Sequence, residues 1–139
     1  AIIGIPGLAF YFAAREFGFN TNVSPANLAQ NWWTIPVLAG YAVMNGVLEE
    51  VVMLGFLFVR FEQLKLRPWT GILISALIRG SYHLYQGFGG FVGNVVMGVV
   101  FGYLYRRWGR VMPLVVAHTI LDLFSFIGYA LIAPYVDWF

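Results

Sequence analysis

The stretch TIPVLAGYAVMNGVLEEVVMLGFLFV, residues 34–59, decides the fold because it is long and almost entirely apolar. A helix needs about 20 predominantly apolar residues to cross a bilayer, so this stretch predicts a transmembrane helix that tilts or protrudes. Residues 1–14 are expected to be the end of another such helix, truncated at the N-terminus. Three further stretches qualify or nearly qualify: 69–86, 88–105 and 111–133. The sequence therefore predicts an all-α, polytopic transmembrane bundle of about five spans, forming a single domain over residues 1–139.

The composition excludes several other classes of protein. Of the 139 residues 60% are hydrophobic and only 10% are charged, whereas an average soluble domain is roughly one quarter charged. The net charge of +2 and the scattered basic residues form no basic face, so no nucleic-acid partner is expected. The absence of cysteine excludes disulfides, thiolate metal sites and a cysteine nucleophile. The expected surroundings are a lipid bilayer.

Two short links carry most of the positive charge. Residues 60–68 (RFEQLKLRP) and residues 106–110 (RRWGR) contain six of the eight lysines and arginines. If every predicted segment spans the membrane, both links lie on the same side. By the positive-inside rule this side is the cytoplasm.

Six ionisable side chains lie inside the predicted spans, in three pairs: Glu49 and Glu50, Arg79 and His83, and His118 and Asp122. A charge near the bilayer centre costs from about 2.5 to more than 10 kcal/mol, so such residues face a protein interior and indicate function. The second and third pairs have i,i+4 spacing and share a helix face. The two glutamates point about 100° apart and are expected to contact different neighbours. Depths of roughly 12–21 Å from the cytoplasmic helix ends place the pairs in one layer.

Carboxylates and imidazoles gathered in a partly wet pocket suit hydrolysis. A buried glutamate is a good general base for water, and a histidine can position that water or donate to an oxyanion. The same residue types also bind divalent ions, so Glu49, His83 and His118 are candidate ligands for a metal such as zinc. The chain has no His-Glu-x-x-His zinc-protease motif, which leaves both possibilities open.

The stretch 88–105 contains two Gly-x-x-x-Gly spacings, which start at Gly89 and Gly98. Small residues let helix backbones approach closely in lipid, where water cannot drive their association. These glycines therefore predict tight helix packing.

The order of the polar motifs resembles that of a known family of intramembrane proteases. The motifs stand here as EEVVML (49–54), RGSYH (79–83) and HTILD (118–122). This set is similar to the Glu-Glu-x-x-x-Arg, Phe-x-x-x-His and His-x-x-x-Asn/Asp motifs of the CPBP family. These are the CAAX proteases and bacteriocin-processing enzymes, also called the Abi family. The resemblance covers about residues 34–126.

The resemblance implies an intramembrane endopeptidase, counted among the metalloproteases, that cleaves peptide bonds near the cytoplasmic face. By this analogy Glu49 activates water with help from His83, His118 and Asp122 stabilise the oxyanion, and Glu50 supports the site. Both a metal and a metal-free glutamate mechanism remain open. The implied substrate is a peptide or protein, such as a lipid-modified CAAX tail. The implied location is the bacterial cytoplasmic membrane.

Two motif positions depart from the family pattern. Leu54 stands where the family has arginine, and Arg79 stands where it has phenylalanine. We expect Arg79 to reach across to Glu50 in a bidentate ion pair, because a buried carboxylate needs a partner.

Three other functions stay open on the sequence alone. The loss of arginine at Leu54 is compatible with an inactive relative that serves as a membrane scaffold or regulator. His83 and His118 could be the axial ligands of a haem. Chains of carboxylates and histidines also serve as ion or proton pathways.

Overall fold

The computed structural model describes residues 9–10, 13–20 and 31–132, and these residues form helices joined by short links. Their only strand-like pairing is an isolated bridge between Asn20 and Gly87. The named elements are α2 (Thr34–Glu50), η1 (Val51–Phe56), α3 (Leu57–Gln63), α4 (Pro68–Tyr82), η2 (Leu84–Gln86), α5 (Phe88–Trp108) and α6 (Met112–Ile132). The predicted all-α membrane bundle is confirmed.

The first three elements form one continuous helix, Thr34–Gln63, which includes the stretch predicted at 34–59. Its central part, η1, is a π-helix in which the backbone N–H of Leu57 bonds to the carbonyl of Val52, five residues earlier. This helix and Phe88–Trp108 are both long and apolar enough to cross a membrane. At about 1.5 Å per residue the first is also longer than a hydrocarbon core of about 30 Å, as the sequence predicts.

The predicted span 69–86 is wrong as a single helix. Pro68 occupies the first position of α4, where its fixed φ suits a helix start, but α4 ends at Tyr82. His83 caps this end, with φ −96° and ψ 5°, and the short 3₁₀-helix η2 follows. Gly87 then turns the chain into α5 with a φ of 96°, a value that favours glycine. The predicted span 1–14 lies mostly outside the described residues.

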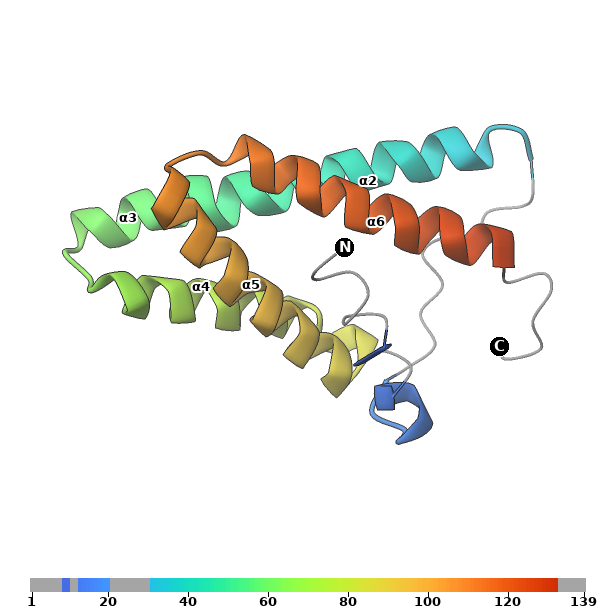
Figure 1. The fold of residues 1–139 in the computed structure, drawn as a ribbon, viewed down its shortest axis with the longest axis horizontal. Coiled ribbons are helices and arrows are strands. Elements are labelled where there is room, and N and C mark those ends of the chain that lie inside the picture. The colour runs from blue at the N-terminus through green and yellow to red at the C-terminus, as the bar shows by residue number, and fades with distance from the viewer. Residues whose placement is uncertain (1–8, 11–12, 21–30, 133–139) are drawn as a thin grey trace.

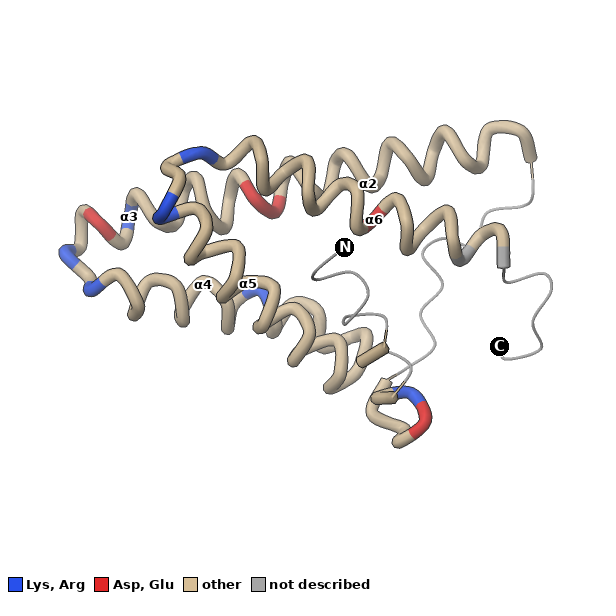
Figure 2. Tube along the Cα trace, in the orientation of Figure 1, with Lys and Arg blue, Asp and Glu red and all other residues tan. Residues whose placement is uncertain are grey.

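The helices pack as two pairs. Figure 1 shows α2 beside α6 and α4 beside α5, with the two pairs meeting at one end and diverging toward the other. The two charged links lie together at the end where the pairs meet, as Figure 2 shows. There Arg106 of α5 lies 3.6 Å from Glu62 of α3 (Nη1 to Oε1). Both basic links therefore lie at the same end of the helix bundle, as their predicted location on one side of the membrane requires.

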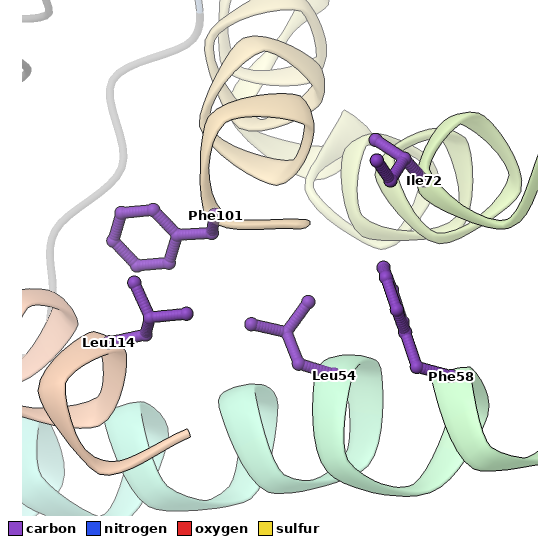
Figure 3. Packing of buried hydrophobic residues seen from close by; sticks show 5 residues of the cluster. All are labelled: Leu54, Phe58, Ile72, Phe101 and Leu114. Atoms are coloured by element: carbon purple, nitrogen blue, oxygen red, sulfur yellow. The ribbon is translucent and has the colours of Figure 1, made fainter. Parts of the chain in front are cut away.

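The apolar core lies where the two pairs meet and draws on every long helix. Figure 3 shows its five buried members, which are Leu54, Phe58, Ile72, Phe101 and Leu114. Leu54 follows Glu50 by four residues, and Leu114 precedes His118 by four. Because four residues are about one helical turn, the polar side chains form the layer next to this core.

The glycines of α5 explain how closely it approaches α4. A Cβ on Gly98 would lie 2.8 Å from the Cα of Ala76, and one on Gly102 would lie 3.3 Å from the side chain of Ile72. The predicted tight packing is confirmed at these two positions. It is wrong at Gly93, where a Cβ would meet no atom of the described residues within 4 Å.

Gly98→Ala is expected to destabilise the protein by about 1–3 kcal/mol, because the new methyl group meets the backbone of α4 and one of the two helices must move. Gly93→Ala is the matched control, since its methyl group has open space and alanine favours a helix. The free energy of unfolding, measured by titration of micelles with a denaturing detergent, should separate the two variants. Equal stability would contradict the packing described here.

Candidate active site

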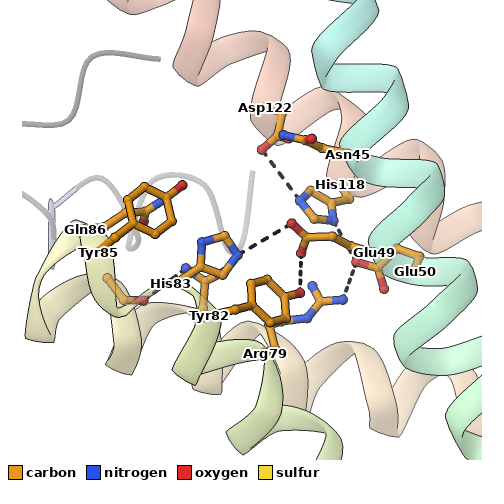
Figure 4. A network of polar contacts seen from close by, with 12 residues as sticks. Asn45, Glu49, Glu50, Arg79, Tyr82, His83, Tyr85, Gln86, His118 and Asp122 are labelled. Carbon is orange, nitrogen blue, oxygen red and sulfur yellow. Dashed lines mark hydrogen bonds and ion pairs between the residues drawn. The ribbon is translucent and has the colours of Figure 1, made fainter. Parts of the chain in front are cut away.

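The structure brings all six ionisable residues of the predicted spans into neighbouring contacts, seen in Figure 4. Glu49 and Glu50 come from the last turn of α2, Arg79 and His83 from the end of α4, and His118 and Asp122 from the middle of α6. The site therefore joins the two helix pairs at the layer next to the core. The α5 helix adds Phe101, whose ring lies beneath the guanidinium of Arg79 at 5.7 Å.

Glu50 is the buried centre of the network. Its side chain is 0% exposed, and its Oε1 accepts from Nη2 of Arg79 at 2.6 Å and lies 2.7 Å from Nδ1 of His118. The predicted ion pair between Arg79 and Glu50 is therefore confirmed. Its predicted bidentate geometry is wrong, because Nη1 of Arg79 and Oε2 of Glu50 have no hydrogen-bond partner among the described residues. Arg79 and His118 therefore contact the same carboxylate oxygen of Glu50.

Leu54 occupies the motif position at which the sequence departs from the Glu-Glu-x-x-x-Arg pattern. Leu54 is 1% exposed and packs in the apolar core. Arg79, which is also 1% exposed, supplies the charge to Glu50 from α4 instead. The cation that pairs with the buried carboxylate therefore comes from another helix, and position 54 contributes only to the apolar core.

Glu49 faces different neighbours from Glu50, as the angle between adjacent helical residues predicts. Its Oε2 accepts a hydrogen bond of 2.7 Å from the hydroxyl of Tyr82, and its Oε1 lies 3.6 Å from Nε2 of His83. The side chains of Glu49 and His83 are 19% and 13% exposed, so both are more accessible than Glu50. Neither ring nitrogen of His83 has a hydrogen-bond partner among the described residues. Both nitrogens are themselves buried, so they are polar atoms left unsatisfied by the described residues.

His118 lies between two carboxylates. Its Nδ1 faces Glu50, and its Nε2 lies 3.6 Å from Oδ1 of Asp122, one turn along the same helix. Asp122 in turn accepts a hydrogen bond of 3.4 Å from Nδ2 of Asn45. Because a carboxylate can only accept, the contact with Glu50 places a proton on Nδ1 of His118.

Two contact residues, Tyr82 and Asn45, were not predicted from the sequence. Asn45 precedes Glu49 by four residues, so its place on the same face of a predicted span was a usable signal. Tyr82 directly precedes His83, and an aromatic residue in an apolar span carries no comparable signal. It reaches Glu49 from the last position of α4.

The three residues expected as metal ligands, Glu49, His83 and His118, face different partners in the structure. Among the residues that the structure describes, no three histidine, aspartate or glutamate side chains gather as a metal set. Both nitrogens of His118 face Glu50 and Asp122, which are not among the expected ligands. Of the two expected histidine ligands, only His83 faces Glu49. The metal stays a prediction from the sequence, without support from the arrangement of the donors.

A hollow of about 290 Å³ between α4 and α5 lies away from the site. Pro68, Trp69, Ile72, Tyr103, Arg106 and Arg107 line it, at the end of the bundle that holds the charged links. None of the six site residues is among them. The accessible part of the site is instead the side of Glu49 and His83 that the exposed Tyr82 borders.

Fold and site together define an all-α integral membrane protein with a buried layer of carboxylates and histidines. The family model described as type II CAAX prenyl endopeptidase Rce1-like matches residues 31–124, which is more than half of the chain and includes every site residue. The chain belongs to this family, and its resemblance to the CAAX proteases is confirmed. In the same comparisons no curated protein and no solved structure matches the chain.

Proposed function

We propose that this protein is an intramembrane endopeptidase in which Glu49 activates the attacking water with the help of His83. The observation that carries the proposal is the pair of atoms Oε1 of Glu49 and Nε2 of His83, 3.6 Å apart on two different helices. One water oxygen about 2.8 Å from each atom would hydrogen-bond to both. The unpartnered nitrogens of His83 support a polar ligand at this place, because buried polar atoms are normally satisfied.

In the proposed reaction Glu49 takes one proton from the water, and the oxygen attacks the carbonyl carbon of the scissile peptide. The carbonyl becomes an oxyanion as the tetrahedral intermediate forms. Glu49 then gives its proton to the leaving nitrogen, so the products are a carboxylic acid and an amine and the base is restored. No group outside the chain and the water is consumed.

His118 is proposed as the donor to the oxyanion. The proton on Nδ1 is held by Glu50, so a doubly protonated ring would carry a second N–H at Nε2, stabilised by Asp122. A charged donor of this kind stabilises negative charge that develops in the transition state. Glu50, which is paired with Arg79, holds the ring of His118 at Nδ1. Asn45 holds Asp122 by a hydrogen bond.

Family membership supports a substrate whose peptide bond follows a prenylated cysteine. The test is cleavage, by the purified full-length protein in liposomes, of a quenched fluorescent peptide with farnesyl-cysteine three residues before its carboxyl terminus. The matched control is the same peptide without the farnesyl group. We expect release of the three terminal residues from the prenylated peptide alone. Absence of cleavage would contradict the proposal and favour the inactive scaffold or regulator.

Removal of metal ions is expected to leave this cleavage unchanged within about twofold, because water activation is assigned to Glu49 and His83. Dialysis against EDTA and then against 1,10-phenanthroline, followed by the same fluorescence assay, checks this expectation. Loss of activity that returns with added zinc would show that an ion takes part, and the proposed water activation by Glu49 and His83 alone would be wrong.

A further inference from the structure

Tyr82 makes the shortest contact of Glu49 among the described residues. Its hydroxyl donates to Oε2 at 2.7 Å, whereas the approach of His83 to Oε1 is 3.6 Å and too long for a direct hydrogen bond. The ring of Tyr82 also lies 4.7 Å from the ring of His83, centroid to centroid. One side chain therefore contacts both groups to which water activation is assigned, as Figure 4 shows.

The geometry points to Tyr82 as a positioning residue for Glu49, an inference that rests on the proposed function. A glutamate side chain has several rotatable bonds, and ordering it for reaction costs conformational entropy. The hydroxyl of Tyr82 occupies Oε2 and so leaves Oε1 turned toward His83. Because the reacting atoms must be placed within a few tenths of an ångström, a base that loses this restraint spends less time in the productive orientation.

The place of Tyr82 in the chain explains how one residue serves both partners. It is the last residue of α4, and His83 is the residue that caps the helix. The hydroxyl crosses from α4 to α2, so the base on one helix pair is fixed against the histidine on the other. With 40% of its surface exposed, Tyr82 borders the accessible side of the site instead of filling the core.

A purely structural role, a clamp between α2 and α4, would have different consequences. Loss of a clamp would lower the free energy of unfolding and would leave the rate of the folded enzyme unchanged. Loss of a positioning contact would lower kcat while KM stays the same, because the contact acts on the base and not on the bound peptide.

The test is Tyr82→Phe, which removes only the hydroxyl, assayed in liposomes with the farnesylated peptide. We expect kcat to fall by about 10- to 100-fold with KM within twofold. Tyr103→Phe is the matched control. Tyr103 lies on α5, is similarly exposed, and stacks on Trp69, which is at the opposite end of α4 from Tyr82. An unchanged kcat in Tyr82→Phe, or a loss explained entirely by unfolding, would overturn the inference.

Glu49→Gln, measured beside it, separates this inference from the proposed function. If Glu49→Gln is inactive and Tyr82→Phe is fully active, only the role of Tyr82 is wrong. If Glu49→Gln retains activity, the proposed base and the inference fail together.

The contact itself can be tested without turnover. 3-Fluorotyrosine placed at position 82 should change its ¹⁹F chemical shift when Glu49→Gln is introduced, because the acceptor of its hydroxyl changes. The same label at position 103 should not respond. Equal shifts at position 82 with and without Glu49→Gln would overturn the inference.

Discussion

Glu49→Gln is expected to reduce cleavage of the farnesylated peptide by about 10²–10⁴-fold, the usual cost of losing a general base. Glutamine has the same shape and still accepts the hydrogen bond of Tyr82 through its carbonyl oxygen, but it cannot take a proton from water. The measurement is the initial rate in liposomes, together with the unfolding midpoint, which should stay near that of the unchanged protein.

Glu62→Gln provides the matched control for this experiment. It makes the same chemical change on the same continuous helix, at a side chain that is 65% exposed and lies beside Arg106. This variant should cleave at the rate of the unchanged protein. Full activity in Glu49→Gln would assign water activation to another residue and end the proposed mechanism.

Arg79→Phe, which introduces the first residue of the Phe-x-x-x-His motif that the sequence resembles, is expected to lower the free energy of unfolding by about 3–5 kcal/mol. The variant leaves Glu50 fully buried without its arginine, and an uncompensated buried charge is costly. Detergent titration of the purified protein measures this loss. Arg107→Phe is the control, because Arg107 is exposed in the last turn of α5 and its replacement leaves no buried carboxylate unpaired among the described residues.

Adding Leu54→Arg to Arg79→Phe tests whether the cation has moved between helices. Position 54 lies about one turn from Glu50 on the same helix, so a guanidinium there can approach the carboxylate. The double variant should recover much of the stability that Arg79→Phe loses. Leu54→Arg alone should be destabilising, since it puts a second cation into the apolar core. A double variant no more stable than Arg79→Phe would contradict the relocation.

Much of the fold could be predicted because long apolar stretches leave few alternatives in a membrane. The boundaries of α5 and α6 differ from the predicted 88–105 and 111–133 by three residues or fewer. The end of α4 at Tyr82 was missed, because no glycine or proline lies between Tyr82 and Gly87 to mark it. The π-helix was missed as well, because the apolar run 51–56 is equally compatible with an α-helix.

Part of the site could be predicted because a buried charge is stable only when an opposite charge or a hydrogen-bond partner lies beside it. The different neighbours of Glu49 and Glu50 follow from helix geometry, and the pairing of Glu50 with Arg79 follows from the cost of an unpaired charge. The contact of Tyr82 with Glu49 depends on the relative position of α2 and α4, which sequence spacing does not give. The same is true of the sharing of Oε1 of Glu50 by two donors.

The π-helix that follows Glu50 sets the angular phase of the whole of α2 relative to α3. A π-helix has more residues per turn than an α-helix, so each of its residues turns the chain through a smaller angle. Over residues 51–56 the difference is on the order of one residue, or about 100°. With α3 fixed, winding residues 51–56 as a regular α-helix would put Val51 in the direction where Glu50 now meets Arg79. Glu50 would then point where Glu49 now meets His83. The π-helix thus determines which of two adjacent glutamates is buried against Arg79 and which lies on the more accessible side of the site.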